Sequence, residues 1–443
     1  MIAPSKKRRL KVLITEGSSA SARETIYTLG HQYDIGILDA DPVCLCRFSR
    51  LVKRFHRCPH YASAPAEYLR SLVDTVRSES YDVVVPTHDQ VYLLARVADV
   101  FGEGLRQHVG IALPDFAALR RMQGKADFIR TLQELNIPVP PTRIVRSLRE
   151  LGSSVEFPCY FKLPYGTAGM GVRRVTNWEE LRRVASEFEQ SPQHGHAPEI
   201  LVQQPAKGTM CTAQAIFQEG RMIAAHCAES LSRSVRGQGF RVSVSHPTVI
   251  EHVRRLGQHL RWHGAIFLEY VYDPASRQPQ FIECNPRIGE PVNAMLCGVN
   301  LGELLVRISL GEKLEPLETT SANYPTEVLP PKILPKSRSH IDFLLLVADA
   351  VAGANRRRIV SQAWRMVTGT GAYKESFSEI TRPSDDWLSL IPAVYTFLQI
   401  LVWPQLARRL TQNVVDNYSL PQYGVDNVER LTAETLKACL EVV

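Results

Sequence analysis

The sequence predicts an α/β and α+β protein, in which a doubly wound parallel sheet is followed by an antiparallel, strand-rich region and a helical C-terminal region. Three observations predict this order. Short apolar runs alternate with helical patterns near the N-terminus, strand patterns joined by turn residues fill the middle, and apolar helical stretches dominate the end. With 443 residues, the chain is long enough for roughly two or three domains with buried cores.

The composition is that of an ordinary folded protein. Hydrophobic residues make up 44% of the chain and charged residues 22%, which excludes the disordered and fibrous classes. The formal net charge is +7, and the only dense basic run lies at residues 6–11. Because a nucleic-acid-binding protein carries a stronger and more clustered excess, we expect no nucleic-acid partner and interpret this run as a solvated tail.

The cysteines indicate a reducing setting. There are nine of them, spread over the whole chain, and no apolar signal-peptide core follows the first basic residues. Cys44 and Cys46 are the closest pair, but no second pair or His/Cys cluster completes a zinc site. We therefore expect a cytoplasmic protein without structural zinc.

The N-terminal elements follow a strand, helix, strand order. Apolar residues 10–15 predict a first strand, small residues then begin a helical pattern, and a second strand follows at 34–40. Residues 81–86 repeat the pattern, which predicts a Rossmann-like domain over 1–114. Gly17, in the first turn, suits a phosphate loop or a plain strand-to-helix turn, and a single glycine favours the plain turn.

The middle of the chain predicts antiparallel pairs. A helical pattern over 121–135 ends at Asn136-Ile137-Pro138, and residues 157–175 read as a strand, a glycine-rich loop and a second strand. Turn residues 273–279 join two further apolar runs into another hairpin. The remaining strand patterns lie at 199–204, 209–217, 265–272 and 280–284.

The glycine-rich loop is the first feature with chemical meaning. Gly166, Gly169 and Gly171 let backbone N–H groups approach a polyphosphate, and Thr167 can donate its hydroxyl. Lys162, on the incoming strand, adds a positive charge. A plain hairpin turn is the alternative interpretation.

Two acidic residues and an amide point to a metal site. Side chains at Glu283 and Asn285 share one strand face because the period of a strand is two, and the hairpin can bring Glu269 beside them. Oxygen ligands of this kind suit Mg²⁺, and Arg287 on the same face can bind a phosphoryl group or a carboxylate. Solvated acids on an exposed hairpin are the alternative, which the apolar neighbours on both strands disfavour.

In this order the parts resemble the ATP-grasp superfamily, most closely the carbamoyl phosphate synthase-like branch of carboxylate–amine ligases. The resemblance covers roughly residues 10–315 and implies ATP bound between two α+β subdomains over 115–320, with a C-terminal helical region over 321–443. The segments that carry it are GKADFIRTLQELNIPVPPT, YFKLPYGTAGMGV, LVQQPAKG and GAIFLEYVYDPASRQPQFIECNPRIG.

The resemblance also implies roles for individual residues. Lys125 and Lys162 would hold the ATP phosphates beneath the loop 166–171, and Arg287 would steady the transferred phosphoryl group. The cofactors implied are ATP and one or two Mg²⁺ ions, with Mn²⁺ as an alternative, held by Glu269, Glu283 and Asn285. The adenine edge would be read by the backbone of Gln203, Gln204, Pro205 and Ala206. Weaker candidates for contact with triphosphate or substrate are Arg233, Arg236 and Arg241.

Two departures from the family pattern stand out. No acidic residue occurs from Leu201 to Phe217, where the family often has a glutamate for the ribose, so ribose recognition stays open. The second departure lies at the end of the third strand, where the family pattern has a pair of carboxylates. Here the residues are Thr87, His88 and Asp89, so one carboxylate is lost and a histidine is gained. His88 is a candidate for substrate contact, although helix capping by Thr87 or Asp89 is the favoured explanation.

The resemblance implies an ATP-dependent ligase that makes an amide through an acyl phosphate, releasing ADP and phosphate, in the biosynthesis of small metabolites or amino-acid conjugates. The partners are then ATP, a small carboxylate and an amine. A carboxylase or another acyl-phosphate-forming enzyme is the alternative within the fold. A nucleotide-binding protein without turnover is the alternative from another class.

The sequence of the C-terminal region gives the weakest indication of structure and function. Its most apolar window is 387–407, in which Pro392, Pro404 and several polar residues argue against a membrane-spanning helix. A core helix is favoured over contact with a membrane surface. Four roles stay open for the region: docking on the grasp domain, closing the substrate pocket, forming a homodimer, or touching a membrane.

Overall fold

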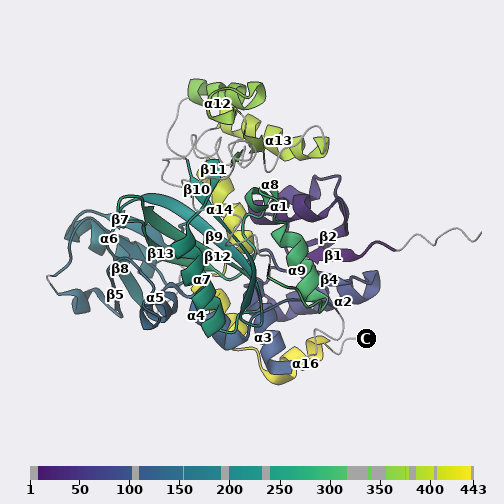
Figure 1. Ribbon diagram of the computed structural model, residues 1–443, viewed down its shortest axis with the longest axis horizontal. Coiled ribbons are helices and arrows are strands. Elements are labelled where there is room, and N and C mark those ends of the chain that lie inside the picture. Colours follow the sequence, from purple (N-terminus) through teal and green to yellow (C-terminus); the bar gives the residue numbers. More distant parts are fainter. Residues whose placement is uncertain are drawn as a thin grey trace, which may run out of the picture.

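The fold is taken from a computed structural model (Figure 1). The structure describes residues 8–101, 109–152, 154–190, 199–231, 240–316, 338–340, 356–374, 376–378, 386–403 and 407–440. Arg233 and Arg236, two of the weaker predicted site residues, lie outside these ranges.

The N-terminal part is a four-stranded sheet, parallel as predicted, and its strands lie in the order β3-β2-β1-β4. Successive side chains of a strand point to opposite faces, so Leu13 packs with α2 and α3, while Val12 and Ile14 pack with α1 and α9. The strands are β1 (Lys11–Ile14), β2 (Asp34–Asp39), β3 (Val52–Arg57) and β4 (Val83–Val85). The helices are α1 (Ala20–Leu29), α2 (Pro65–Glu79), α3 (Val91–Phe101) and α9 (Leu301–Ser309).

A small antiparallel sheet, in the order β5-β8-β6-β7, forms the first half of the middle region. One helix, α6 (Trp178–Glu189), begins where the side chain of Asn177 accepts the N–H of Glu180. It packs on the sheet through Leu181, Val184 and Phe188, which recur on one helical face. The strands are β5 (Thr142–Val145), β6 (Cys159–Lys162), β7 (Val172–Val175) and β8 (Ile200–Gln203).

A seven-stranded sheet, in the order β13-β12-β9-β10-β11-β14-β15, lies between the small sheet and the N-terminal part (Figure 1). Helices α4 (Phe116–Gln123), α5 (Lys125–Glu134) and α7 (Pro247–His259) share one hydrophobic core with its outer face. The inner face turns toward the N-terminal part, where α8 (Val292–Leu296) also lies. The central strands are β9 (Thr209–Gln218), β10 (Arg221–Ser230), β11 (Phe240–Val244), β12 (Gly264–Asp273) and β13 (Gln278–Asn285).

The C-terminal region differs from the expected separate helical unit. It adds two short strands to the large sheet, β14 (Arg338–His340) and β15 (Phe377–Ser378). Its last helices return to the N-terminal part, where α15 contacts α3 and α16 contacts α2 and α3. The helices are α12 (Arg356–Thr368), α13 (Leu390–Val402), α14 (Ala407–Tyr418), α15 (Gln422–Glu429) and α16 (Ala433–Leu440). Short 3₁₀ turns lie at Leu45–Arg47, Leu148–Leu151, Gly371–Tyr373 and Trp387–Ser389.

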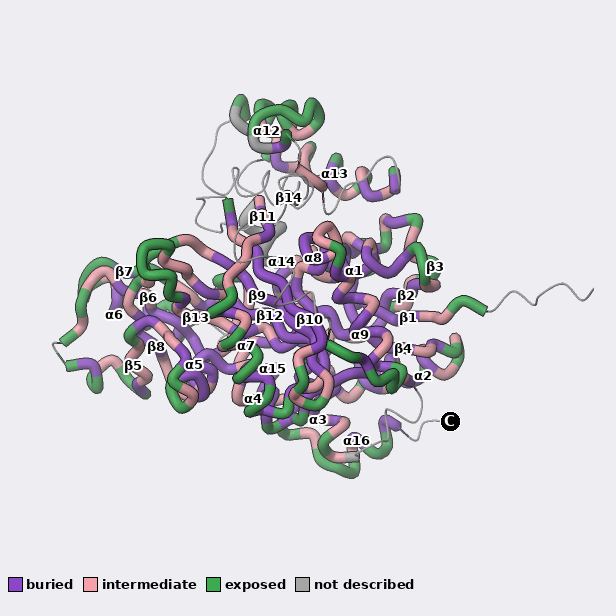
Figure 2. Tube along the Cα trace, in the orientation of Figure 1, coloured by how far each residue is buried: buried purple, intermediate pink, exposed green. Residues whose placement is uncertain are grey.

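The interpretation of the apolar window 387–407 as a core helix is wrong for the residues that the structure describes. Within α13 only Ala393 and Ile400 are buried, while several large apolar side chains of this helix are exposed (Figure 2). None of the helices formed by the described residues has the length and apolar character needed to cross a membrane.

One buried ion pair fixes the start of this helical unit to the N-terminal part. Asp386 accepts from Arg23 Nη2 at 2.8 Å, from Ser49 Oγ at 2.5 Å and from the Arg50 N–H at 2.9 Å. The side chains of Arg23 and Asp386 are each only 1% exposed. Such a pair is weak evidence for net stability, but removing one partner leaves an uncompensated buried charge.

We expect Asp386→Ala to destabilise the protein by about 3–5 kcal/mol, because Arg23 would stay buried without its carboxylate. The measurement is the apparent melting temperature of the full chain. Glu187→Ala, which breaks an exposed pair with Arg183 on α6, is the matched control and should cost less than about 0.5 kcal/mol. Equal melting temperatures for the two variants would contradict the expectation.

Candidate active site

The predicted phosphate loop is the tip of the β6-β7 hairpin. Gly166, Ala168 and Gly169 have φ of 124°, 51° and 71°, so the chain turns through the left-handed region that glycine favours. The Leu163 N–H donates to the Gly171 carbonyl at 2.8 Å and closes the base of the loop. The predicted hairpin is confirmed, while binding of phosphate by the loop stays a prediction.

Lys125 connects three parts of the site. Its Nζ donates to the Gly166 carbonyl at 2.8 Å and lies 2.9 Å from Glu283 Oε1. The Lys125 N–H, at the start of α5, donates to the Pro164 carbonyl at 2.9 Å. The side chain is 5% exposed, so Lys125 is buried within the site and is not a surface lysine.

The hairpin β12-β13 sets the two predicted acidic ligands opposite each other. Glu269 pairs with Glu283 in the register, and Asn285 pairs with Phe267 one step along the same face. Lys162 is buried beside them. Burial lowers the pKa of Lys162 to about 8, and the positive charge of Lys125 adds to the effect, whereas Glu283 and Glu269 oppose it.

These residues fit a magnesium ion. Two carboxylates directly opposite each other on one sheet face repel, and a cation between them would relieve the repulsion. The donors are oxygens, which Mg²⁺ prefers, and phosphate oxygens and water usually complete its octahedral shell. Among the described residues, no group of three or more His, Cys, Asp or Glu side chains gathers as a metal site. The candidate set is therefore two carboxylates and one amide: Glu269, Glu283 and Asn285.

Arg287 is buried and joins the proposed metal ligands to the N-terminal part. Its Nη2 donates to Asn285 Oδ1 at 2.9 Å and lies 3.1 Å from His88 Nε2. Burial and the adjacent guanidinium lower the pKa of His88 to about 4, so this imidazole is neutral at pH 7. Because a guanidinium can only donate, His88 Nε2 is the acceptor.

The Asp89 carboxylate is the meeting point of four segments. It accepts from Thr167 Oγ1 at 2.8 Å, from the Leu420 N–H at 3.2 Å and from Arg287 Nε at 3.4 Å. Although burial raises its pKa, the hydrogen bonds with His88 and Thr167 and the positive charge of Arg287 hold the pKa well below its usual range. Asp89 is therefore ionised and ties the phosphate loop to the C-terminal segment.

This arrangement corrects the favoured explanation for the end of the third strand. The Thr87 hydroxyl donates to Glu16 Oε1 at 3.1 Å, and the bonds of Asp89 go to other segments, so neither side chain caps α3. His88 instead contacts the Tyr418 ring at a tilted angle of 40°, with centroids 4.0 Å apart.

Some polar groups of the segment 203–206, where the resemblance implies adenine recognition, already form hydrogen bonds within the protein. The Gln204 N–H donates to the Pro141 carbonyl at 2.9 Å, and Gln203 Nε2 donates to Thr142 Oγ1 at 2.8 Å. Pro205 and Ala206 follow the strand in a loop that is more open to solvent. Recognition of adenine by this segment stays a prediction.

Arg241 lies inside the protein, on β11. Its guanidinium pairs with Glu24 Oε1 at 2.9 Å and with Glu290, and it is 2% exposed. Glu24 belongs to α1, so this cluster fastens the N-terminal part to the large sheet. Its predicted contact with triphosphate or substrate stays a prediction.

A pair of buried acids at the ends of β1 and β2 was missed at the sequence level. The Asp39 carboxylate accepts the Gly17 N–H at 2.6 Å and Asn417 Nδ2 at 2.8 Å, and Glu16 accepts the Ser18 N–H at 2.7 Å. The carboxyl ends of parallel strands are the usual ligand edge of such a sheet. That rule could have paired the two acids, but the sequence carried no signal for Asn417, which is almost 400 residues away.

A cavity of about 450 Å³ opens beside the phosphate loop. The loop, the N-terminal part and the C-terminal segment each form part of its wall. Of the lining residues that the structure describes, Asp416 is the only acidic one, and none is a lysine or arginine. The lining residues are His60, Ser63, Gly166, Thr167, Met170, Asn413, Asp416, Asn417, Ser419, Pro421 and Tyr423.

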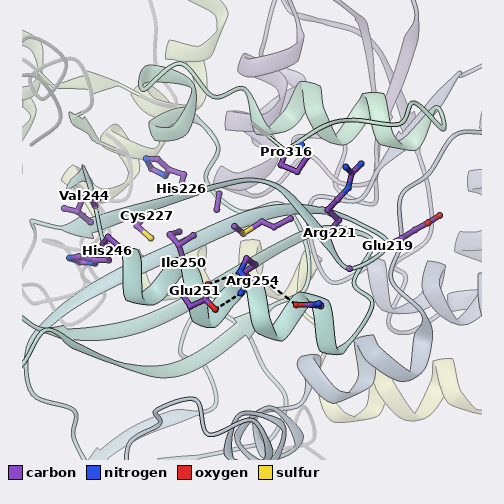
Figure 3. A pocket seen from close by; sticks show the side chains of 16 residues that line it. Glu219, Arg221, His226, Cys227, Val244, His246, Ile250, Glu251, Arg254 and Pro316 are labelled. Atoms are coloured by element: carbon purple, nitrogen blue, oxygen red, sulfur yellow. Dashed lines mark hydrogen bonds and ion pairs between the residues drawn. The ribbon is translucent and has the colours of Figure 1, made fainter. Parts of the chain in front are cut away.

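A second cavity, of about 660 Å³, lies on the outer side of the large sheet between α7 and β10 (Figure 3). Both arginines of its lining make polar contacts within the protein. Arg254 pairs with Glu251 at 2.6 Å, and Arg221 bonds the Leu314 carbonyl. None of the predicted site residues lines it, so it is separate from the candidate active site.

Comparison with known proteins agrees with this geometry. Residues 244–317, which carry the proposed metal ligands, match the family described as "Carbamoyl-phosphate synthase L chain, ATP binding domain". Over 293 residues the chain is 22% identical to the mitochondrial arginine-specific carbamoyl phosphate synthase large chain of Schizosaccharomyces pombe. The alignment covers 60% of this chain but only 24% of that relative, so the chain spans about a quarter of its length.

Solved structures share the fold at low identity. The biotin carboxylase domain of the Hydrogenobacter thermophilus 2-oxoglutarate carboxylase, in complex with MgADP, ADP and bicarbonate, gives a TM-score of 0.56 at 17% identity, covering 70% of this chain and 71% of that one. An L-amino acid ligase from Bacillus licheniformis gives 0.51 at 16% identity, covering 71% and 77%.

These matches agree with the resemblance: residues 244–317 match an ATP-binding domain of the carbamoyl phosphate synthase family, and the solved structures share the fold. Which reaction this chain runs, and on which substrates, is a matter for proposal.

The pKa of Glu16 gives a pH prediction. Burial, and then the charge of Asp39, raises this pKa from 4.5 to about 7. A raised carboxyl pKa means that the folded state holds the proton more tightly, so this stability is present below about pH 4.5 and is lost as the pH rises through 7.

Glu16→Gln is neutral at every pH. Between pH 5 and pH 8 we expect its free energy of unfolding to rise by up to about 3 kcal/mol relative to that of the natural protein. The measurement is the melting temperature of both proteins at the two pH values. Glu179→Gln, on the exposed side of α6, is the control and should leave the profile unchanged. Parallel profiles for Glu16→Gln and the natural protein would show that Glu16 ionises normally.

Proposed function

We propose that the protein is an ATP-dependent carboxylate–amine ligase that joins two small molecules through an acyl phosphate. The observation that carries the proposal is the convergence on Glu283: the carboxylate lies opposite Glu269 and 2.9 Å from Lys125 Nζ, which also holds the phosphate loop. Cationic side chains and oxygen ligands therefore face one space beneath a glycine-rich loop.

In this proposal the buried lysines neutralise the phosphates of ATP. Lys125 and Lys162 are almost fully buried, and in a site that excludes water a positive charge acts strongly on a phosphate. Bound at Glu269, Glu283 and Asn285, Mg²⁺ would neutralise charge on the phosphates. The hinge backbone over 203–206 would meet the adenine.

The reaction has two steps. A carboxylate oxygen of the substrate attacks the γ-phosphorus of ATP, the bond from that phosphorus to the β,γ-bridging oxygen breaks, and ADP leaves with its electron pair. The amine nitrogen of the second substrate then attacks the carbonyl carbon, the bond from that carbon to the phosphate oxygen breaks, and phosphate leaves as the nitrogen loses a proton. Arg287, whose guanidinium is held by Asn285, His88 and Asp89, would hold the phosphoryl oxygens.

The second substrate would bind in the cavity beside the phosphate loop. Asp416 is the only acid among the described residues of the lining, which include no lysine or arginine, and this suits the ammonium group of an amine. Burial raises the pKa of Asp416, opposed by His60, and an ammonium group bound beside the carboxylate would favour its ionised form. The cavity touches Gly166 and Thr167, which would place the amine next to the acyl phosphate.

The decisive experiment supplies MgATP with pools of carboxylic and amino acids and uses hydroxylamine to trap the acyl phosphate. We expect ADP, phosphate and a hydroxamate in one pool. AMP with pyrophosphate would overturn the acyl-phosphate mechanism, and turnover with bicarbonate alone would favour a carboxylase. Binding of ATP with no turnover in any pool would favour a nucleotide-binding protein.

In the same assay, Glu283→Gln should lower ADP formation at least about a hundredfold, because a charge that holds the metal is lost. Binding of ATP without metal should persist. Glu315→Gln, at an exposed position, is the matched control and should retain full turnover. Unchanged turnover in Glu283→Gln would contradict the assignment of the metal site.

We expect Asp416→Asn to raise KM for the amine by about tenfold to a hundredfold, the cost of losing a hydrogen bond to a charged group. ADP formation with hydroxylamine should stay within twofold, because activation of the carboxylate does not need Asp416. Ser63→Ala, in the same lining, is the neutral control. An unchanged KM in Asp416→Asn would exclude an ammonium group beside this carboxylate.

A further inference from the structure

Helices α12 and α13 lie apart from the three sheets, at one end of the molecule (Figure 1). They contact each other, and Arg356 Nη2 of α12 donates to the Val402 carbonyl of α13 at 3.0 Å. The buried Asp386 anchors the unit to the N-terminal part. It is therefore a defined projection from the fold and has no residue in the candidate active site.

One face of α13 is apolar and exposed. Its members are spaced by three, four, seven and eleven residues from the first, which places them on one side of a helix. They are Ile391, Val394, Tyr395, Leu398 and Val402, with exposed fractions of 43%, 51%, 62%, 52% and 48%.

One face of α12 is also apolar and exposed. Val360, Trp364 and Val367, at helical spacing, are 47%, 68% and 77% exposed. Trp387 and Trp403, at the two ends of α13, are 56% and 53% exposed. Three of the five tryptophans of the chain are thus open to solvent on this unit, although large apolar patches are rare on monomeric soluble proteins.

Among the residues of this unit that the structure describes, the exposed charges are all positive. The described residues from 356 to 403 contain one acid, Asp386, which is buried against Arg23. Arg357 and Arg365 are exposed beside the apolar face of α12. The cations in the same stretch are Arg356, Arg357, Arg358, Arg365 and Lys374.

We propose that the two helices form a docking surface for an anionic lipid membrane, with both helices lying in the interface. Helices of this kind place tryptophan, tyrosine and leucine at the boundary between headgroups and acyl chains, and arginines toward the headgroups. A second copy of this chain is a poorer occupant, because a symmetric contact would set arginines against arginines.

The test is co-flotation of the full chain with vesicles of phosphatidylcholine, with and without phosphatidylglycerol, while tryptophan emission is recorded. We expect strong binding to the anionic vesicles, weak binding to the neutral ones and a blue shift of emission on binding. No flotation with either vesicle, or equal flotation with both, would overturn the proposal.

Two variants test which residues carry the binding. Val394→Glu with Leu398→Glu should lower the partition coefficient at least about tenfold, because it puts charge on the inserted face. Arg357→Gln with Arg365→Gln should lower binding to anionic vesicles about fivefold for each arginine and leave neutral vesicles unaffected. Both pairs are at exposed positions, so the melting temperature should hardly change.

The matched control is Val43→Glu with Leu310→Glu, which adds the same charge at exposed apolar positions elsewhere and should leave flotation unchanged. Equal loss in this control would show a general effect of charge and overturn the assignment. A lipid-free dimer, detected by light scattering and abolished by Val394→Glu with Leu398→Glu, would reassign the surface to self-association.

Discussion

The buried carboxylate of Asp89 is the contact on which the arrangement of the site depends. It lies at the end of a strand of the N-terminal sheet and accepts from Thr167 of the phosphate loop, Arg287 of the large sheet and the Leu420 backbone of the C-terminal segment. An ionised group in this position must be fully satisfied, because a buried charge without partners is very costly. The requirement holds the four segments in one geometry.

The same requirement explains why cations and anions alternate through the site. Lys125 compensates Glu283, Arg241 compensates Glu24, and Arg287 lies between Asp89 and the amide of Asn285. Each pair joins elements that are far apart in the sequence. Charges that we propose for ATP chemistry therefore also hold the subdomains against one another.

The C-terminal segment is an integral part of the site. Asn417 donates to Asp39, the Tyr418 ring contacts the His88 ring, and the Leu420 N–H donates to Asp89. Asn417 and Ser419 of this segment also line the cavity beside the phosphate loop, so in the proposed reaction the segment would help to select the second substrate. Upstream, α12 and α13 face away from this site and carry a different surface chemistry.

Local pattern determined much of the fold and the central part of the site. Because the side chains of a strand alternate, the spacing of Glu283 and Asn285 already set both on one face, and the turn between the strands brought Glu269 opposite. The glycines of the loop at 166–171 also predicted a tight turn, since few other residues adopt positive φ.

Only the tertiary structure decided the rest. The role of Asp89, the shifted pKa of Glu16 and the entry of Asn417 depend on burial and on partners tens to hundreds of residues away, which no local period encodes. The apolar residues of α13 likewise read as core, because sequence gives hydrophobicity and period but not which faces the rest of the chain covers.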